Sequence, residues 1–115
     1  MDINHREVNG VQILNLKGRL DLASGSGLKE QIKALMDQEK CTIHLNLQEV
    51  DFINSSGLGV LVSLMKEIRV KKGRLSLSNL ASYVQEIFEI TQLSHIFEIF
   101  TTEEEALSSY QTVNA

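Results

Sequence analysis

Residues 41–78 follow the order strand, helix, strand, and this order constrains the fold more than any other feature. Residues 41–47 alternate apolar and polar side chains, which is the period of a strand with one apolar face. An apolar stripe at helical spacing follows, made up of Leu58, Leu61, Val62, Met65 and Ile68. Gly73 is expected to end that helix in the left-handed conformation, before a strand over residues 74–78. A helical crossover normally joins parallel strands, so this segment predicts a parallel sheet.

The N-terminal part adds a hairpin and a helix. Residues 3–8 and 11–17 predict two antiparallel strands, because the Asn-Gly pair between them favours a tight turn. The sequence Ser-Gly-Ser-Gly at residues 24–27 is expected to supply caps and a break. A first helix should follow this break and end near Glu39.

The C-terminal part adds two helices and one strand. Residues 80–88 have apolar side chains at helical spacing, and residues 96–100 predict an edge strand. Thr102 followed by Glu105 is a capping-box pattern that predicts a last helix. Residues 112–115 are expected to fray.

These elements predict the fold class, which is α/β. We expect one domain over residues 1–115, with a mixed sheet of four to five strands and about four helices. The sheet should open with an antiparallel hairpin and continue through parallel crossovers.

Composition and charge indicate the cellular location of the protein and the kinds of partner that it binds. Cys41 is the only cysteine, so no intrachain disulfide can form. The N-terminus lacks the pattern of a signal peptide, and the longest apolar run, residues 58–65, is interrupted by polar and small side chains. We therefore expect a cytoplasmic protein without membrane insertion. The net charge is −4, and the basic cluster over residues 66–74 has no interleaved aromatic side chains, so no direct nucleic-acid binding is predicted.

Signatures of catalysis are missing from the sequence. His5, His44 and His95 have no metal-ligand spacing, and each is expected to be structural or solvated. Residues 54–59 lack the Gly-x-Ser-x-Gly of a nucleophile elbow and the third glycine of a dinucleotide loop. Residues 24–27 lack the Gly-Lys-Ser/Thr ending of a phosphate-binding loop. We predict no enzymatic activity, no cofactor and no metal site.

Two serines stand where the strand of the crossover runs into its helix. Ser55 and Ser56 should therefore lie at the carboxyl edge of the sheet, where open α/β sheets commonly place functional sites. One interpretation is a plain N-cap, since serine and asparagine are preferred there. The other is a phosphate acceptor, because the unpaired N–H groups of a first helical turn tolerate a phosphate. Gly57 and Gly59 are expected to let the helix start approach neighbouring backbone.

The sequence Asp-Phe-Ile-Asn-Ser-Ser-Gly-Leu-Gly-Val at residues 51–60 resembles the STAS domain of bacterial anti-sigma factor antagonists (anti-anti-sigma factors). The resemblance extends over nearly the whole chain. It includes Gly-Arg-Leu-Asp at residues 18–21, Leu-Asn-Leu at residues 45–47 and the acidic last helix.

This resemblance implies a switch between partners. In that family the unphosphorylated antagonist binds an anti-sigma factor that is also a serine kinase. Phosphorylation releases the kinase, and a PP2C-type phosphatase resets the antagonist. Carried over to this chain, the acceptor is Ser55, with Ser56 the less favoured choice. Asp21 should lie near Ser55, and the remaining residues of the partner-binding edge are Asn54, Ser56, Gly57 and Leu58.

Two positions depart from the pattern of the phosphorylated members. Asn54 stands where they usually have aspartate, and it keeps hydrogen-bonding capacity without the charge. Arg19 stands where some members have an acid, and it makes this surface less negative. The alternative function is therefore a constitutive scaffold subunit of a lipid-transport or stress-sensing complex, in which Ser55 is only a cap.

Overall fold

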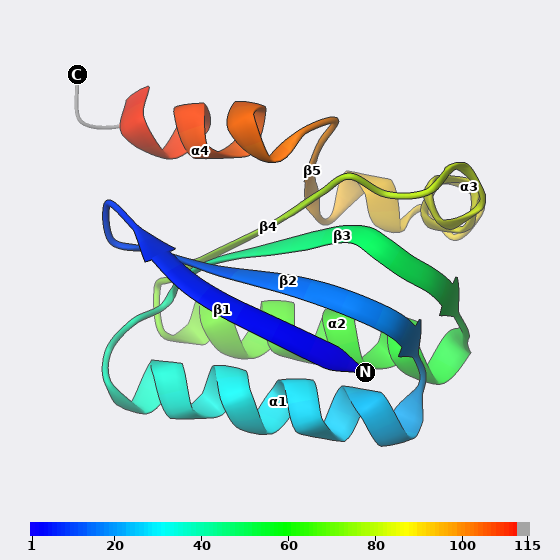
Figure 1. Ribbon diagram of the computed structural model, residues 1–115, viewed down its shortest axis with the longest axis horizontal. Helices are drawn as coiled ribbons and strands as arrows, with labels where there is room; N and C mark the ends of the chain where they lie inside the picture. Colours follow the sequence, from blue (N-terminus) through cyan, green and yellow to red (C-terminus); the bar gives the residue numbers. More distant parts are fainter. Residues whose placement is uncertain (113–115) are drawn as a thin grey trace.

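Five strands form one sheet, in which their order is the same as along the chain (Figure 1). The computed structural model describes residues 1–112. Its strands are β1 (Asp2–Val8), β2 (Val11–Leu20), β3 (Thr42–Ile53), β4 (Arg74–Ser78) and β5 (Glu98–Phe100). β1 is antiparallel to β2, and the other neighbouring pairs are parallel. The predicted fold class is confirmed, including the opening hairpin, whose turn residues Asn9 and Gly10 both have positive φ.

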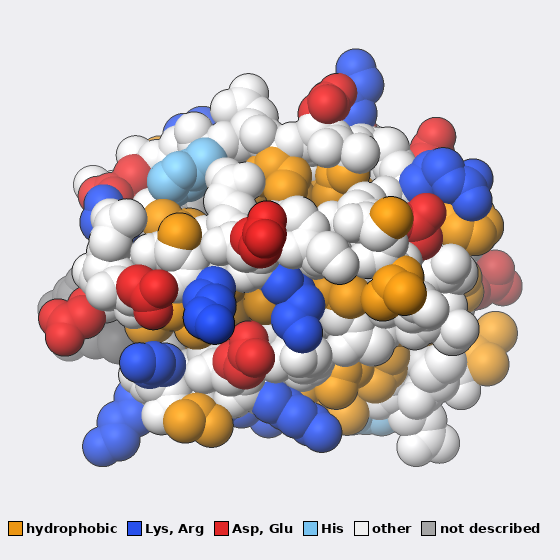
Figure 2. All heavy atoms as spheres, turned by 90° about the horizontal axis from the view of Figure 1, so that it is seen from below, with side chains coloured by type: hydrophobic (Ala, Val, Ile, Leu, Met, Phe, Trp, Pro, Cys, Tyr) orange, Lys and Arg blue, Asp and Glu red, His pale blue; other side chains and the backbone are white. Residues whose placement is uncertain are grey.

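The helices cover both faces of this sheet. They are α1 (Leu22–Asp37), α2 (Ser55–Val70), α3 (Ser82–Ile90) and α4 (Glu103–Thr112), and a short 3-10 helix, η1 (Leu93–His95), follows α3. α1 and α2 lie on one face and α4 lies over the other, while α3 is seen nearly end-on beside the end of β3 (Figure 1). Basic and acidic side chains are interspersed on the face formed by α1 and α2 (Figure 2). Of the segment expected to fray, residues 113–115 lie outside the described residues.

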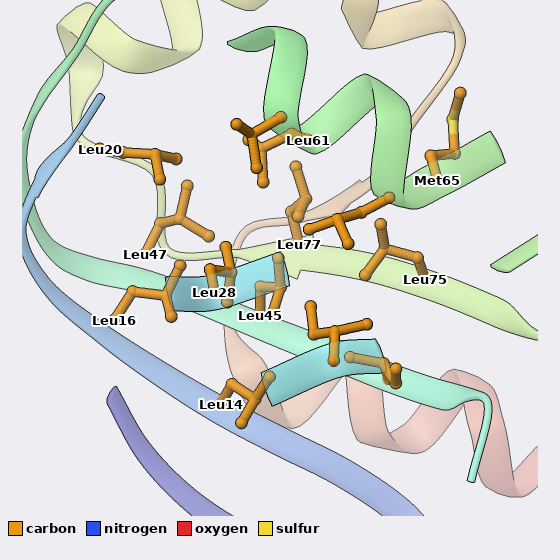
Figure 3. Packing of buried hydrophobic residues seen from close by; sticks show 14 of the residues in the cluster. Leu14, Leu16, Leu20, Leu28, Leu45, Leu47, Leu61, Met65, Leu75 and Leu77 are labelled. Carbon is orange, nitrogen blue, oxygen red and sulfur yellow. The ribbon is translucent and has the colours of Figure 1, made fainter. Parts of the chain in front are cut away.

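The face of the sheet under α1 and α2 is apolar. Alternate side chains of β3 point into it, and they pack with leucines of the neighbouring strands and helices (Figure 3). Its members include Leu14, Leu16, Leu28, Leu45, Leu47, Leu61, Leu75 and Leu77. Burying one leucine side chain contributes about 1.5–3 kcal/mol. This layer therefore fixes α1 and α2 against the sheet, and with them the position of their N-termini.

The opposite face contains buried polar groups held by one another. The ring nitrogens of His44 lie 2.7 Å from the hydroxyl oxygens of Ser76 and Ser78, which belong to β4. Ser76 also bonds the hydroxyl of Tyr110 from α4 at 2.7 Å. Burial disfavours the charged imidazole and lowers the pKa of His44 to about 4. The structure thus assigns His44 a structural role beneath α4, in agreement with the sequence.

Two predicted helix boundaries are wrong. α1 begins at Leu22, so the expected break at residues 24–27 lies inside the helix. Asp21 caps this helix, and Gly25 is buried where a Cβ would lie 2.6 Å from a methyl carbon of Val60. At the end of α2 the left-handed residue is Lys72, with φ of 59°. Gly73 is required for space instead, because a Cβ there would lie 2.3 Å from the carbonyl oxygen of Cys41.

The strand boundaries also differ from the prediction. β3 continues beyond residue 47 to Ile53, because residues 49–53 keep pairing with the end of β2. β5 is shorter than predicted and begins at Glu98, since Ile96 and Phe97 donate backbone hydrogen bonds to Leu93 in the preceding turn. The extension of β3 has the larger consequence, because it carries the strand up to the serine pair.

Candidate functional site

α1 and α2 start side by side at the carboxyl edge of the sheet. Leu20, the last residue of β2, pairs with Ile53, the last residue of β3. α1 then begins at Leu22 and α2 at Ser55. Because the two strands are parallel and end in register, both helices direct their N-terminal N–H groups to the same edge (Figure 1). This edge is the candidate site.

Asn54 caps α2. Its backbone is extended, with φ of −117° and ψ of −177°, and its side-chain oxygen accepts a hydrogen bond from the N–H of Gly57 at 2.9 Å. Ser55 and Ser56 follow as the first two helical residues, and both are exposed. The expectation that one of the serines is the cap is therefore wrong. Asparagine satisfies one of the unpaired donors of the first turn, and the serine hydroxyls are left facing solvent.

Gly57 fixes how closely α2 approaches β2. A Cβ at this position would lie 2.2 Å from the carbonyl oxygen of Leu20, which also accepts a hydrogen bond from the N–H of Asn54 at 3.4 Å. The predicted close approach is therefore confirmed for Gly57. It is wrong for Gly59, where a Cβ would meet nothing within 4 Å. Leu58, half-buried, packs against the core cluster.

Asp21 caps α1 with a full capping box. Its carboxylate accepts a hydrogen bond from the backbone N–H of Ser24 at 3.0 Å, and the Ser24 hydroxyl accepts one from the backbone N–H of Asp21 at 3.0 Å. The bond from the Ser24 backbone, and a second from its hydroxyl, hold the pKa of the Asp21 carboxyl below its usual value. The structure brings Asp21 to the same edge as Ser55. Asp21 follows Leu20, whose carbonyl oxygen accepts a hydrogen bond from the N–H of Asn54, the cap of α2.

The charge at the start of α2 is low. No acidic residue lies in its first turn. The positive end of the helix dipole and the remaining N–H donors of that turn therefore face a neutral cap and two hydroxyls. A phosphoryl group on the first residue would find donors there and no carboxylate on the same turn.

Sequence reasoning named Arg19 at this surface but missed its contact with Phe52 and the position of Tyr83. Arg19 pairs with Phe52 across β2 and β3, and its guanidinium carbon lies 3.9 Å from the centroid of the Phe52 ring. Tyr83 of α3 is 39% exposed. Burial raises the pKa of its hydroxyl, with a further contribution from the negative charge of Asp51. The register that pairs Arg19 with Phe52 follows two irregularities in the pairing of β2 with β3, so the sequence contained no signal for this contact.

Within residues 1–112, no three His, Cys, Asp or Glu side chains are grouped as metal ligands would be. The helices of that same part of the chain are too short or too polar to cross a membrane.

Known proteins share this fold and this sequence pattern. The family model for the STAS domain matches residues 2–106. The anti-sigma-B factor antagonist of Listeria monocytogenes is 31% identical over 105 residues, which is 91% of each chain. That of Bacillus subtilis is 32% identical over 99 residues, or 86% of this chain and 88% of the relative. The structure of the Bacillus cell fate determinant SpoIIAA in its phosphorylated form has a TM-score of 0.75 and 25% identity, over 95% of this chain and 99% of SpoIIAA.

Proposed function

This chain belongs to the STAS domain family, and from this premise we propose that it is a phosphorylation-regulated anti-sigma factor antagonist. Unphosphorylated, it binds a kinase-type anti-sigma factor in the bacterial cytoplasm through the edge formed by the starts of α1 and α2. Phosphorylation of Ser55 by that kinase ends the binding, and a PP2C-type phosphatase restores it. The chain supplies the phosphate acceptor and no catalysis of its own.

The observation that carries this proposal is the position of Ser55. Its side chain is exposed as the first residue of a helix whose cap, Asn54, already satisfies the N–H of Gly57. Phosphorylation therefore removes no cap and breaks no hydrogen bond of the fold. The likeness to SpoIIAA, a protein solved in a phosphorylated form, supports the same assignment.

The physical basis of release is electrostatic. A phosphoserine adds about −1.5 to −2 charges at pH 7. The helix start accommodates this charge, whereas a like charge facing it across an interface costs several kcal/mol. Since about 1.4 kcal/mol corresponds to a tenfold change in affinity, a single phosphate is sufficient for a switch.

The test measures binding to the kinase-type anti-sigma factor of the same organism by calorimetry. The parent and Ser55→Ala should bind alike, and Ser55→Asp should bind at least about tenfold more weakly. Ser26→Asp is the matched control, because it adds the same charge at an exposed position of α1 and should retain binding. Equal binding by Ser55→Asp and the parent would refute the switch.

A second measurement separates the switch from a constitutive scaffold. The kinase and ATP are incubated with the parent, Ser55→Ala and Ser56→Ala, and the products are mapped by mass spectrometry. We expect phosphate on the parent and on Ser56→Ala, and none on Ser55→Ala. Absence of phosphate from all three, with binding intact, would favour the scaffold, for which the neutral Asn54 is the best argument.

A further inference from the structure

Arg19 is held in a fixed place beside the start of α2. It is the penultimate residue of β2, and it precedes Leu20, whose carbonyl oxygen accepts the N–H of Asn54. Its guanidinium carbon lies 3.9 Å from the centroid of the Phe52 ring. Stacking on an aromatic ring orients the guanidinium plane and leaves its N–H groups free to point outward.

These N–H groups have little to bind within the protein. Arg19 forms an ion pair with Asp21, in which Nε lies 3.9 Å from the nearest carboxylate oxygen; this distance is too long for a hydrogen bond. The other oxygen of Asp21 is occupied by the cap of α1. Among residues 1–110, whose side chains the structure describes, no oxygen accepts a hydrogen bond from the guanidinium, and the Arg19 side chain is 63% exposed. It is therefore an oriented cation with unused donors.

The carboxyl edge around Arg19 also has exposed large apolar and aromatic side chains. Leu22, the first residue of α1, is 65% exposed, and Tyr83 of α3 is 39% exposed. Burial raises the pKa of the Tyr83 hydroxyl; the negative charge of Asp51 adds to this shift and the positive charge of Arg19 opposes it. Interfaces are enriched in arginine and tyrosine, and the residues whose truncation costs most binding energy are often of these types.

We propose that Arg19 is a specificity-determining residue that binds a carboxylate on the partner, so that the partner face meeting Phe52 and Tyr83 is acidic. This inference rests on the proposed function, and it explains why one phosphate would end binding. The acidic face that Arg19 attracts is the same face that a phosphate on Ser55 would repel. A chain with an acid at position 19 would require a partner of the opposite charge, and the two pairs would not exchange.

The experiment compares charge reversals on one strand. Arg19→Glu should weaken binding to the kinase-type anti-sigma factor by at least about tenfold, whereas Lys17→Glu should change it less than about threefold. Lys17 is the matched control, because it lies on β2, is 66% exposed and faces Glu49 at 3.8 Å. Arg19→Lys should bind less tightly than the parent and more tightly than Arg19→Glu, since lysine keeps the charge and loses the planar stacking.

Each outcome decides between the two proposals. If Arg19→Glu binds as the parent does while Ser55→Asp still releases the kinase, the inference about Arg19 is wrong and the switch stands. Tighter binding by Arg19→Glu would show a basic partner face and overturn the inference as well. If the parent does not bind the kinase at all, the proposed function fails and this inference fails with it. Thermal unfolding of Arg19→Glu, expected to remain cooperative and to occur above the temperature of the binding assay, confirms that a loss of binding is not a loss of fold.

Discussion

α1 and α2 begin at the same edge of the sheet, after neighbouring parallel strands, and yet their caps differ in charge. α1 is capped by the carboxylate of Asp21, which forms a full capping box with Ser24. α2 is capped by the neutral amide of Asn54, which accepts a single hydrogen bond from Gly57. The negative charge that a helix start favours is therefore built into α1 and left out of α2. The start of α2 can therefore accommodate a negative charge that is added after folding.

The two helices also differ in what their first glycine faces. Gly25 of α1 faces the Val60 side chain, whereas Gly57 of α2 faces the backbone of Leu20. A side chain can rotate away from an added methyl group, but a strand backbone cannot do so without moving the sheet. An added methyl group should therefore be tolerated less well at Gly57 than at Gly25.

The largest expected effect tests this difference between the two glycines. Gly57→Ala should lower the free energy of unfolding by about 3 kcal/mol or more, because its Cβ would collide with the Leu20 carbonyl. Gly25→Ala should cost less, about 1–3 kcal/mol, because the methyl groups of Val60 can shift. Gly59→Ala is the control, with open space around its Cβ, and should stabilise by up to about 1 kcal/mol. Urea unfolding measures all three, and an equal loss for Gly25→Ala and Gly57→Ala would contradict the difference between the helices.

The next effect comes from the caps. Asn54→Ala should lower the free energy of unfolding by about 1 kcal/mol, because the N–H of Gly57 loses its acceptor. Asp21→Ala should cost more, because it removes an ionised acceptor that receives hydrogen bonds from both the backbone N–H and the hydroxyl of Ser24. Urea unfolding at pH 7 is again the measurement, and Asn54→Asp, which keeps the cap, is the control. A larger loss from Asn54→Ala than from Asp21→Ala would reverse the comparison.

The sequence alone predicted the crossover correctly, but it did not predict where α1 begins. The alternation over residues 41–47 and the helical stripe after it are local patterns, and they predicted the sheet and the place of Ser55. α1 begins earlier than predicted because Gly25 packs against Val60, thirty-five positions away in the chain. Glycine lowers helix propensity, and here tertiary packing overrides that local preference.

The cap of α2 was not predictable from residue types. Asn54, Ser55 and Ser56 are all good N-cap residues. The N-cap is the residue that keeps an extended backbone directly after the strand. That residue is Asn54, because β3 continues to Ile53, farther than its apolar alternation suggests. Likewise, the contact of Arg19 with Phe52 depends on the register between β2 and β3 after two irregularities. These features follow from three-dimensional pairing, for which a single sequence has no pattern.

A smaller effect tests whether a negative charge stabilises the start of α2 more than the start of α1. Ser55→Asp places a carboxylate on the first residue of α2, and Leu22→Asp places one on the first residue of α1. Both positions are exposed. Ser55→Asp should raise the free energy of unfolding by about 0.3–1 kcal/mol at low salt, through the helix dipole. Leu22→Asp should give less, because Asp21 already supplies that charge and would repel a second one. Equal gains at both sites would show that the charge of the cap does not matter.

The smallest expected effect is the response of the two caps to pH. Hydrogen bonds from Ser24 lower the pKa of Asp21 in the folded protein. A carboxyl group with a lowered folded pKa contributes stability above its unfolded value, near 3.8, and loses it as the pH falls through the folded value. The amide of Asn54 does not titrate in this range.

His44 acts in a higher window, between its usual value of 6.5 and its folded pKa of about 4. There the unfolded state binds more protons, so stability falls as the pH falls, in every variant that retains His44.

We therefore expect the difference in unfolding free energy between the parent and Asp21→Asn to be constant from pH 7 to about 5 and to shrink below about pH 4. The difference between the parent and Asn54→Ala should show no such decrease, and a parallel decrease in both would remove the distinction between a charged and a neutral helix start.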